Sequence, residues 1–141
     1  MNNLEFSEEK KLNQADLLSL YNDANWLAYT NSPDLLQQAV SNSLYVLSVW
    51  ENGQLVGLIR LVGDGLTIVY IQDILVMKSH KRRKIGSLLL QKALEKFKNI
   101  RQKVLLTDDN EETRGFYEAL GFSSCDKGDL VAFVKLENKK K

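Results

Sequence analysis

Apolar positions recur along the chain with two spacings, one typical of helices and one typical of strands. Helical spacing covers residues 14–24, 33–40, 85–100 and 109–120. Alternating or continuous apolar runs predict strands at residues 4–6, 45–50, 55–62, 66–77, 104–107, 122–125 and 130–136. The predicted order is therefore β-α-α-β-β-β-α-β-α-β-β.

Turn residues support this division. Asn52 and Gly53 lie between two predicted strands and favour a type I′ hairpin turn, because both positions of that turn need positive φ. Gly121 fits the residue that closes the last predicted helix. Strand 66–77 is apolar nearly throughout, so we expect it to be buried on both faces. A strand, the helix 85–100 and a further strand follow in sequence, which predicts an α/β fold whose mixed sheet has parallel strands at its middle.

The length and composition are those of one folded domain. The 141 residues are 44% hydrophobic and 26% charged, which are ordinary globular values. We expect a single domain over residues 1–137 and a disordered basic tail over residues 138–141. The net charge of +1, from 19 basic and 18 acidic residues, argues against a dedicated nucleic-acid-binding protein.

The remaining compositional features concern location and metals. Cys125 is the single cysteine, which fits a reducing compartment. The first residues lack the apolar core of a signal peptide, and no apolar run approaches the ~20 residues that span a bilayer. We therefore expect a cytoplasmic protein with no membrane association. His80 and Cys125 have no ligand spacing around them, so we expect no metal site.

A cluster of cations stands directly before the helix 85–100. A helix start presents unpaired N–H groups and a partial positive charge, and both attract phosphate. Gly86 would let the backbone approach a ligand closely. Two alternatives remain: a solvated basic turn with no ligand, and a nuclear-import or nucleic-acid patch, although the aromatic residues of single-strand binders are missing. The basic residues are Lys78, Lys81, Arg82, Arg83 and Lys84.

This segment resembles a cofactor motif. Lys81-Arg82-Arg83-Lys84-Ile85-Gly86, followed by Ser87 and three leucines, is similar to the Arg/Gln-x-x-Gly-x-Gly/Ala motif of GNAT acetyltransferases. Lys81 stands where the family usually has Arg or Gln, and Lys84 stands where it usually has the first glycine. The resemblance implies that the pyrophosphate of acetyl-CoA is held by Lys81, Arg82, Arg83, Lys84, Ile85, Gly86 and Ser87.

A second segment resembles the later signature of the same family, Asn…Phe-Tyr-Glu-x-x-Gly-Phe. It runs from Asn110 to Phe122, about 30 residues after the first motif. The resemblance, which spans residues 44–136, implies the GNAT fold, a mixed sheet flanked by about four helices. It also implies that Tyr117 is the general acid that protonates the departing thiolate, and that Asn110 contacts the cofactor. Asn110 also fits a simple helix cap.

The central strand carries the other implied groups. The resemblance predicts a splay after this strand, where the backbone of Ile74, Leu75 and Val76 pairs with the pantetheine arm of the cofactor. Asp73 is an ionisable residue in an apolar strand, and burial would raise its pKa toward that of a general base. The alternatives are a structural carboxylate at Asp73, or a water chain with Gln72 orienting a water.

Trp26, Tyr29 and Tyr45 are candidate walls of an acceptor pocket between the first two helices and the last predicted hairpin. Together these features predict an acetyl-CoA-dependent N-acetyltransferase that acts on a primary amine of a small molecule. One alternative is acetylation of protein lysines or N-termini. Another is a CoA-binding sensor or partner module without turnover. The sequence leaves a homodimer open.

Overall fold

The computed structural model describes residues 3–137. The described chain divides into two compact units, residues 3–105 and residues 106–137. The predicted basic tail, residues 138–141, lies outside the described residues.

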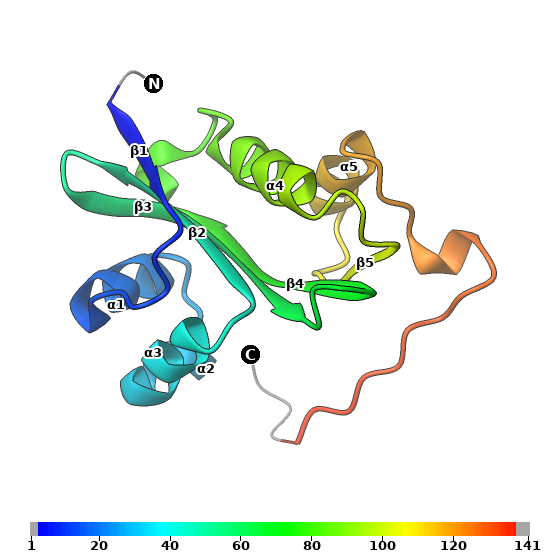
Figure 1. Ribbon diagram of the computed structural model, residues 1–141, viewed down its shortest axis with the longest axis horizontal. Coiled ribbons are helices and arrows are strands. Elements are labelled where there is room, and N and C mark those ends of the chain that lie inside the picture. The colour runs from blue at the N-terminus through cyan, green and yellow to red at the C-terminus, as the bar shows by residue number, and fades with distance from the viewer. Residues whose placement is uncertain (1–2, 138–141) are drawn as a thin grey trace. The chain divides into compact units, whose positions relative to one another are not determined.

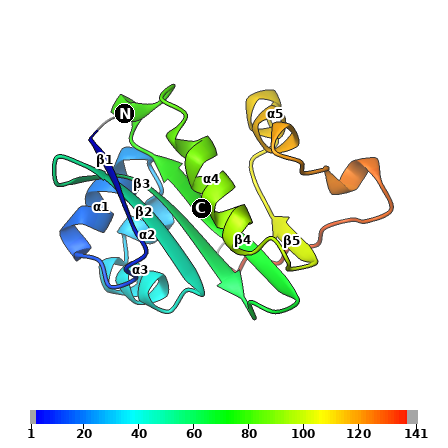
Figure 2. The same cartoon turned by 45° about the horizontal axis from the view of Figure 1, so that its top comes forward.

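The first unit is built on a five-stranded mixed sheet with the order β1-β2-β3-β4-β5 (Figure 2). Neighbouring strands from β1 to β4 are antiparallel, and β4 and β5 are parallel. The parallel pair flanks the crossover helix in sequence, as predicted. In the described sheet this pair lies at one edge, so the expectation of parallel strands at the middle was wrong, because no described strand follows β5 in the sheet. The strands are β1 (Leu4–Ser7), β2 (Tyr45–Glu51), β3 (Gln54–Gly63), β4 (Ile68–Val76) and β5 (Gln102–Leu105).

Helices cover both faces of this sheet (Figure 1). On one face lie α1 (Gln14–Asp23), the short α2 (Leu27–Thr30) and α3 (Pro33–Ser41), and on the other lies α4 (Ile85–Lys96). Their apolar stripes pack on the strands and form the core, in which Leu17, Leu36 and Leu89 are fully buried. The α/β class and its mixed sheet are confirmed, while α2 has no counterpart among the predicted elements.

The strands differ from prediction in one respect that matters for the site. Asn52 and Gly53 both have positive φ, as the hairpin required. The expectation that the central strand is buried on both faces was wrong, because buried and less buried positions alternate along β4 and Gln72 is exposed. Gln72 has no partner on β3, since Arg60 pairs with Asp73 and Leu61 pairs with Ile71. This β-bulge redirects the side chains around Asp73.

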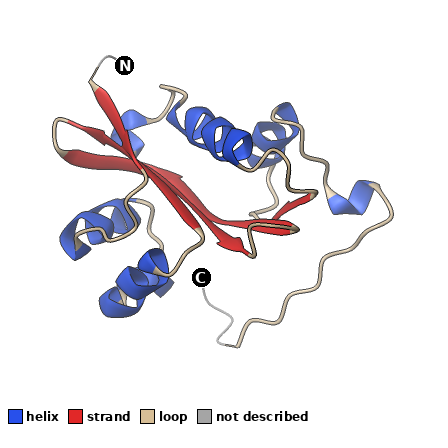
Figure 3. Ribbon diagram, viewed as in Figure 1, coloured by secondary structure: helices blue, strands red, loops and turns tan. Residues whose placement is uncertain are grey.

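The second unit contains α5 (Glu111–Ala119) and a single 3₁₀ turn, Cys125–Lys127. Gly121 closes α5 with a φ of 96°, as predicted. The predicted strands at residues 122–125 and 130–136 were wrong, since Figure 3 shows loop in both places apart from the short turn. The physical reason is that apolar alternation makes a strand only where a neighbouring strand supplies hydrogen bonds, and no described strand pairs with either segment.

Two further observations apply to residues 3–137. None of the helices in this range is both long and apolar enough to cross a membrane. No group of three His, Cys, Asp or Glu side chains in this range is placed to hold a metal ion.

Candidate cofactor site and active site

A basic turn connects the end of β4 to the start of α4. Residues Lys78–His80 form a 3₁₀ turn, and Lys81 continues in an extended conformation. Arg82 and Lys84 then take left-handed backbone conformations, with φ values of 70° and 61°. Two left-handed residues within three positions make this a tight turn, and α4 begins immediately after it at Ile85.

Lys84 occupies the cap position of α4 with φ 61° and ψ 24°. Glycine adopts this conformation freely, whereas a residue with a side chain loses about 1–2 kcal/mol in it. The backbone at Lys84 therefore has a conformation that suits glycine. The lysine at this position lowers the stability of the turn and adds a positive charge beside the helix start.

The start of α4 leaves backbone donors unused. No side chain caps this end. The N–H groups of Ile85, Gly86 and Ser87 donate to no acceptor within residues 3–137, and the first helical bond runs from Leu88 N–H to the Lys84 carbonyl. Unpaired N–H groups at a helix start attract an anion.

Most of the neighbouring cations are also unpaired. Lys81, Arg82 and Lys84 are exposed and form no ion pair with a described acidic residue. Each is free to make charge-assisted hydrogen bonds to a phosphate group. Arg83 differs, because its guanidinium binds both carboxylate oxygens of Glu51 at 3.2 and 2.9 Å.

Glu51 fastens the basic turn to the hairpin of β2 and β3. Its Oε1 lies 2.7 Å from His80 Nε2, and the other ring nitrogen of His80 lies 2.8 Å from Ser79 Oγ. Hydrogen bonds from Arg83, and then from His80, lower the pKa of Glu51 to about 2. The carboxylate is therefore ionised at neutral pH and holds two side chains of the turn in place. Sequence reasoning did not find this clamp, because Glu51 stands 29 residues from His80.

Gly57 on β3 brings the start of α4 close to the sheet. It pairs with Val76 at the end of β4. A Cβ atom at this position would lie 2.8 Å from Val49 Cγ1 and 3.3 Å from Ile85 Cγ2. These distances are too short for carbon atoms in ordinary contact. Glycine thus allows Ile85 to pack against the sheet, and the helix start lies beside the end of β4.

The last part of β4 has an unpaired edge. Its parallel pairing with β5 ends at Ile71. Ile74, Leu75 and Val76 pair with β3 on one side, and no described strand pairs with them on the other. This arrangement matches the predicted splay and leaves backbone groups available for an extended ligand.

Asp73 lies in a buried network on the side of the sheet that α1 covers. It is 2% exposed and accepts hydrogen bonds from Arg60 Nε at 2.8 Å and from the hydroxyls of Tyr21 and Tyr29, both at 2.9 Å. Burial and the charge of Asp73 raise the pKa of both phenols, that of Tyr21 most strongly. This geometry favours the interpretation of Asp73 as a structural carboxylate over its interpretation as a general base.

Tyr29 connects this network to the surface. Its hydroxyl donates to Asp73 and accepts from Gln72 Nε2 at 3.1 Å and from Arg60 at 3.3 Å. Its ring lies against Trp26, with 6.0 Å between ring centroids. The structure therefore brings together four predicted site residues, Trp26, Tyr29, Gln72 and Asp73.

The profile of the Acetyltransferase (GNAT) family matches residues 11–122. The chain belongs to the GNAT acetyltransferase family. Members of this family use acetyl-CoA and act on amine acceptors. The open start of α4 provides the donors and charges that a pyrophosphate requires, so the residues present fit this cofactor.

Solved structures share the fold. The GNAT family acetyltransferase SP0256 from Streptococcus pneumoniae is 33% identical, with a TM-score of 0.84 over 96% of this chain and 99% of its own. Protein SA2161 from methicillin-resistant Staphylococcus aureus is 21% identical, with a TM-score of 0.77 over 94% and 99% of the two chains, and this likeness supports the fold alone. Protein FG08082 of Gibberella zeae, named as an acetyltransferase, is 34% identical over 68 residues, which are 46% of this chain and 37% of that protein.

The second GNAT signature lies in the second unit. Tyr117 is buried on α5 and packs edge-on against Phe116 and Phe122, with centroid distances of 5.0 and 5.8 Å. Burial raises the pKa of its phenol. Its hydroxyl makes no hydrogen bond to another residue in the described part of the chain, so it is available as a donor.

Asn110 is the cap residue of α5. Its side-chain oxygen accepts a hydrogen bond from the backbone N–H of Thr113 at 2.8 Å. The helix begins at Glu111, two residues later than predicted. The side-chain oxygen of Asn110 therefore acts as a helix cap, which is the alternative interpretation of this residue.

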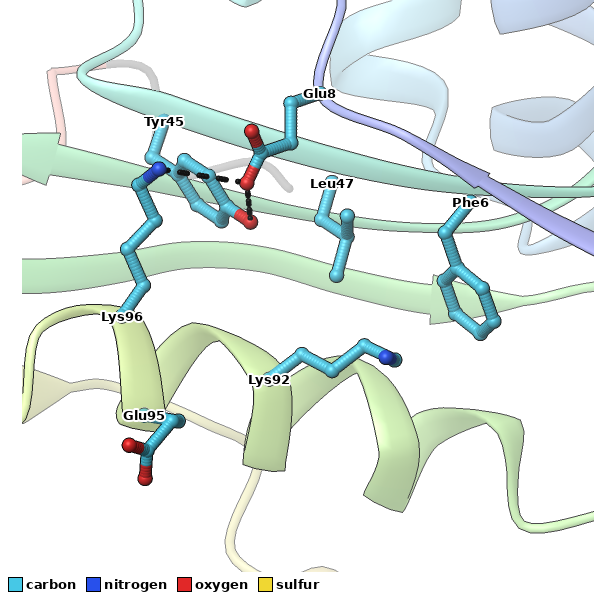
Figure 4. Close-up of a pocket in the computed structure, with 7 residues that line it drawn as sticks. All are labelled: Phe6, Glu8, Tyr45, Leu47, Lys92, Glu95 and Lys96. Carbon is cyan, nitrogen blue, oxygen red and sulfur yellow. Dashed lines mark hydrogen bonds and ion pairs between the residues drawn. The ribbon is translucent and has the colours of Figure 1, made fainter.

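Tyr45 lies apart from Trp26 and Tyr29. It packs edge-on against Phe97, which follows α4, and its hydroxyl donates to Glu8 at 2.7 Å. It lines a groove of about 540 Å³ between β1, β2 and α4, beside Leu47 and Lys96 (Figure 4). The structure thus places this candidate acceptor residue on the α4 face of the sheet, whereas Tyr29 lies on the face that α1 covers.

Proposed function

We propose that this protein is an acetyl-CoA-dependent N-acetyltransferase whose acceptor is a primary amine of a small molecule. The observation that carries the proposal is the open, basic start of α4 beside the unpaired edge of β4, in a chain of the GNAT family. When bound, acetyl-CoA supplies the thioester whose acetyl group is transferred. Each proposed role below belongs to a residue of this chain.

The basic turn holds the phosphates. The backbone N–H groups of Ile85, Gly86 and Ser87 donate to phosphate oxygens, and Lys81, Arg82 and Lys84 add charge-assisted contacts. Arg83 keeps its bonds to Glu51 and fixes the shape of the turn. The backbone edge of Ile74, Leu75 and Val76 orients the pantetheine arm in the manner of an added strand.

Tyr117 supplies the proton that the departing thiolate needs. A general acid must be protonated before it acts, and a phenol meets this condition at neutral pH; burial raises the pKa of Tyr117 further. Because its side-chain oxygen is used by the cap, Asn110 has only its amide nitrogen left for a proposed contact with the cofactor.

The acceptor amine binds beside Trp26, Tyr29 and Gln72. Aromatic faces favour a cationic ligand, as a protonated amine is. Asp73 is a positioning residue in this proposal, since it holds the Tyr29 hydroxyl and its oxygens are already bonded. A water chain that Gln72 orients then takes the proton from the amine.

The first test is cofactor binding. Acetyl-CoA should raise the melting temperature, because a ligand that binds only the folded state stabilises it. The second test is a panel of small amines and lysine peptides that follows the release of free CoA thiol. Turnover on small amines supports the proposal, turnover on peptides alone favours protein acetylation, and binding without any turnover favours a sensor module. The absence of a shift at millimolar acetyl-CoA would contradict all three.

A chain with a single cysteine fits a reducing compartment, and we propose that the enzyme acts in the cytoplasm.

A further inference from the structure

Gln72 and Asp73 are neighbours in β4, yet both side chains bond to the hydroxyl of Tyr29. In a regular strand, adjacent side chains point to opposite faces of the sheet. The β-bulge, which leaves Gln72 without a partner on β3, removes this constraint. Gln72 Nε2 lies 3.1 Å from the Tyr29 hydroxyl, and Asp73 Oδ1 lies 2.9 Å from it. One phenol therefore joins an exposed amide to a buried carboxylate.

The direction of each hydrogen bond at Tyr29 follows from the ion pair of Arg60 and Asp73. Arg60 Nε lies 2.8 Å from Asp73 Oδ2, and both side chains are buried. A carboxylate accepts hydrogen bonds and donates none, so the single hydroxyl proton of Tyr29 points to Asp73. A guanidinium donates and never accepts, so Arg60, at 3.3 Å, takes one lone pair of the Tyr29 oxygen. The remaining lone pair is the one that Gln72 uses.

The amide of Gln72 can therefore bond to Tyr29 in one orientation only. Because the Tyr29 oxygen has no further proton to give, the amide must present its nitrogen, and its carbonyl oxygen Oε1 points away from the phenol. Gln72 is exposed, and no group of the first unit, residues 3–105, donates to Oε1. The buried ion pair thus determines that the exposed end of this amide is a hydrogen-bond acceptor.

An amide oxygen of this kind attracts N–H and O–H donors, and it has two lone pairs. In the proposed function, the acceptor amine lies beside Trp26, Tyr29 and Gln72. A neutral primary amine has two N–H groups, so one can bond to Oε1 while the other gives its proton to the water. An N-methyl amine has a single N–H group and cannot do both.

We propose that Gln72 Oε1 accepts a hydrogen bond from the acceptor amine and selects primary over secondary amines, and that Arg60 and Tyr29 are the positioning residues that fix its orientation. This inference rests on the proposed function. In the transfer, the amine nitrogen bonds to the acetyl carbon, and the carbon–sulfur bond breaks. One amine proton leaves through the water, and the thiolate takes a proton from Tyr117, which regains one from solvent. The amide product keeps the N–H that bonds to Gln72.

The orientation is tested first, and this test needs no substrate. In a proton–nitrogen NMR spectrum, the side-chain amide of Gln72 is assigned by its loss in Gln72→Glu. We expect one of its protons to exchange with water at least about 10-fold more slowly than those of the exposed Gln54, because it is hydrogen-bonded. Tyr29→Phe should remove this protection. Equal exchange at Gln72 and Gln54 in the wild type would overturn the fixed orientation.

The second test compares primary amines of the panel, beginning with phenethylamine, with their N-methyl derivatives. The wild type should favour the primary amine in kcat/KM by at least about 10-fold, as expected for one hydrogen bond. Gln72→Met keeps the length of the side chain without the amide, so it should reduce this preference to about twofold or less, mainly by raising KM for the primary amine. Gln54→Met is the control and should leave the preference unchanged.

Two variants of Arg60 separate its positioning role from a general loss of packing. Arg60→Lys keeps a cation beside Asp73, so the hydroxyl proton of Tyr29 stays directed to the carboxylate and the preference should be retained. Arg60→Met removes the cation, and the preference should be lost. Tyr29→Phe frees the amide without disturbing the ion pair and should weaken the preference even if Arg60→Met does not fold.

The failures of this inference and of the proposed function are distinguishable. An equal preference in the wild type and Gln72→Met, or no preference in the wild type, would overturn the recognition by Gln72 and leave the acetyltransferase activity intact. Binding of acetyl-CoA without turnover of any amine would contradict the proposed function and overturn the amine recognition with it.

Discussion

Helix α4 begins at Lys84 without a side-chain cap, whereas α5 begins at Asn110 with one. The first turn of α5 carries Glu111 and Glu112, which complement its own dipole, while α4 has no acidic residue there. Both helix starts belong to GNAT motifs, and their sequences already differ, since one follows a run of cations and the other combines an Asn cap with two glutamates. In the structure the Asn110 side chain pairs with one donor of α5, the Thr113 N–H, whereas the first three donors of α4 have no partner among residues 3–137.

The difference between the two helix starts separates a contribution to helix stability from a contribution to ligand binding. A capped, acidic start stabilises its helix and repels phosphate, so α5 is expected to contribute through Tyr117 further along. An uncapped, basic start costs helix stability and gains a ligand site. The following variants test this division, from the largest expected effect to the smallest.

The largest effect is expected at Tyr117. Tyr117→Phe keeps the ring among Phe116 and Phe122 but removes the proton donor, so kcat should fall by roughly 100-fold or more. The affinity for acetyl-CoA should stay unchanged in a titration. Tyr45→Phe is the matched control, since this second buried tyrosine lies in the groove between β1, β2 and α4. An unchanged kcat for Tyr117→Phe would show that Tyr117 is not the proton donor.

The next effect concerns the anion site itself. Gly86→Asp places a negative charge in the first turn of α4, so the affinity for acetyl-CoA should fall at least about 10-fold, as expected for the loss of a charge-assisted contact. Gly115→Asp makes the same change on an exposed position of α5, where nothing lies within 4 Å of an added Cβ. Calorimetric titration should show normal affinity for this control. Equal losses of acetyl-CoA affinity in both variants would contradict the proposed difference between the starts of α4 and α5.

Asn110→Ala should act mainly on stability. Loss of the bond to Thr113 N–H should lower the free energy of unfolding by about 1 kcal/mol, measured in urea. If capping is its main role, cofactor affinity should change less than twofold. A much larger loss of affinity with little loss of stability would assign Asn110 to the cofactor site instead.

Lys84→Gly tests the left-handed cap of α4. Relief of the positive φ should raise the free energy of unfolding by about 0.5–1 kcal/mol, after the entropy lost by glycine is subtracted. Arg82→Gly should raise the free energy of unfolding by a similar amount, because Arg82 has a similar φ. If the Lys84 charge binds phosphate, affinity should fall while stability rises, and the loss should shrink at high salt. A stabilised variant with unchanged affinity would mean that the lysine merely replaces glycine.

The smallest effect is the pH dependence of the Glu51 clamp. The folded pKa of about 2 lies below the ordinary value of 4.5, so the clamp stabilises the protein above about pH 4.5. This contribution should decline as the pH falls from there through 2. Unfolding of the wild type and of Glu51→Gln should differ at pH 6 and converge near pH 2. If the free energies of unfolding of the two proteins differed by the same amount across this pH range, the ion pair would contribute nothing to stability.

Local patterns predicted much of the first unit. The hairpin at Asn52 and Gly53, the crossover helix and the parallel pair follow from spacing and turn chemistry, which act over a few residues. The basic turn and its anion-binding role were predicted for the same reason. The last two strands were not predicted correctly, because the pattern at residues 130–136 describes a preference and a strand also needs a partner.

The sequence by itself determined the order of elements, the basic turn that opens α4 and the resemblance of two motifs to one family. Only the tertiary structure decided that Glu51 holds His80, that Tyr21 bonds to Asp73 across 52 residues, and that Tyr45 lies apart from Tyr29. It also decided which helix start is open. These outcomes depend on register and packing between distant segments, and neither is encoded in the spacing of neighbouring residues.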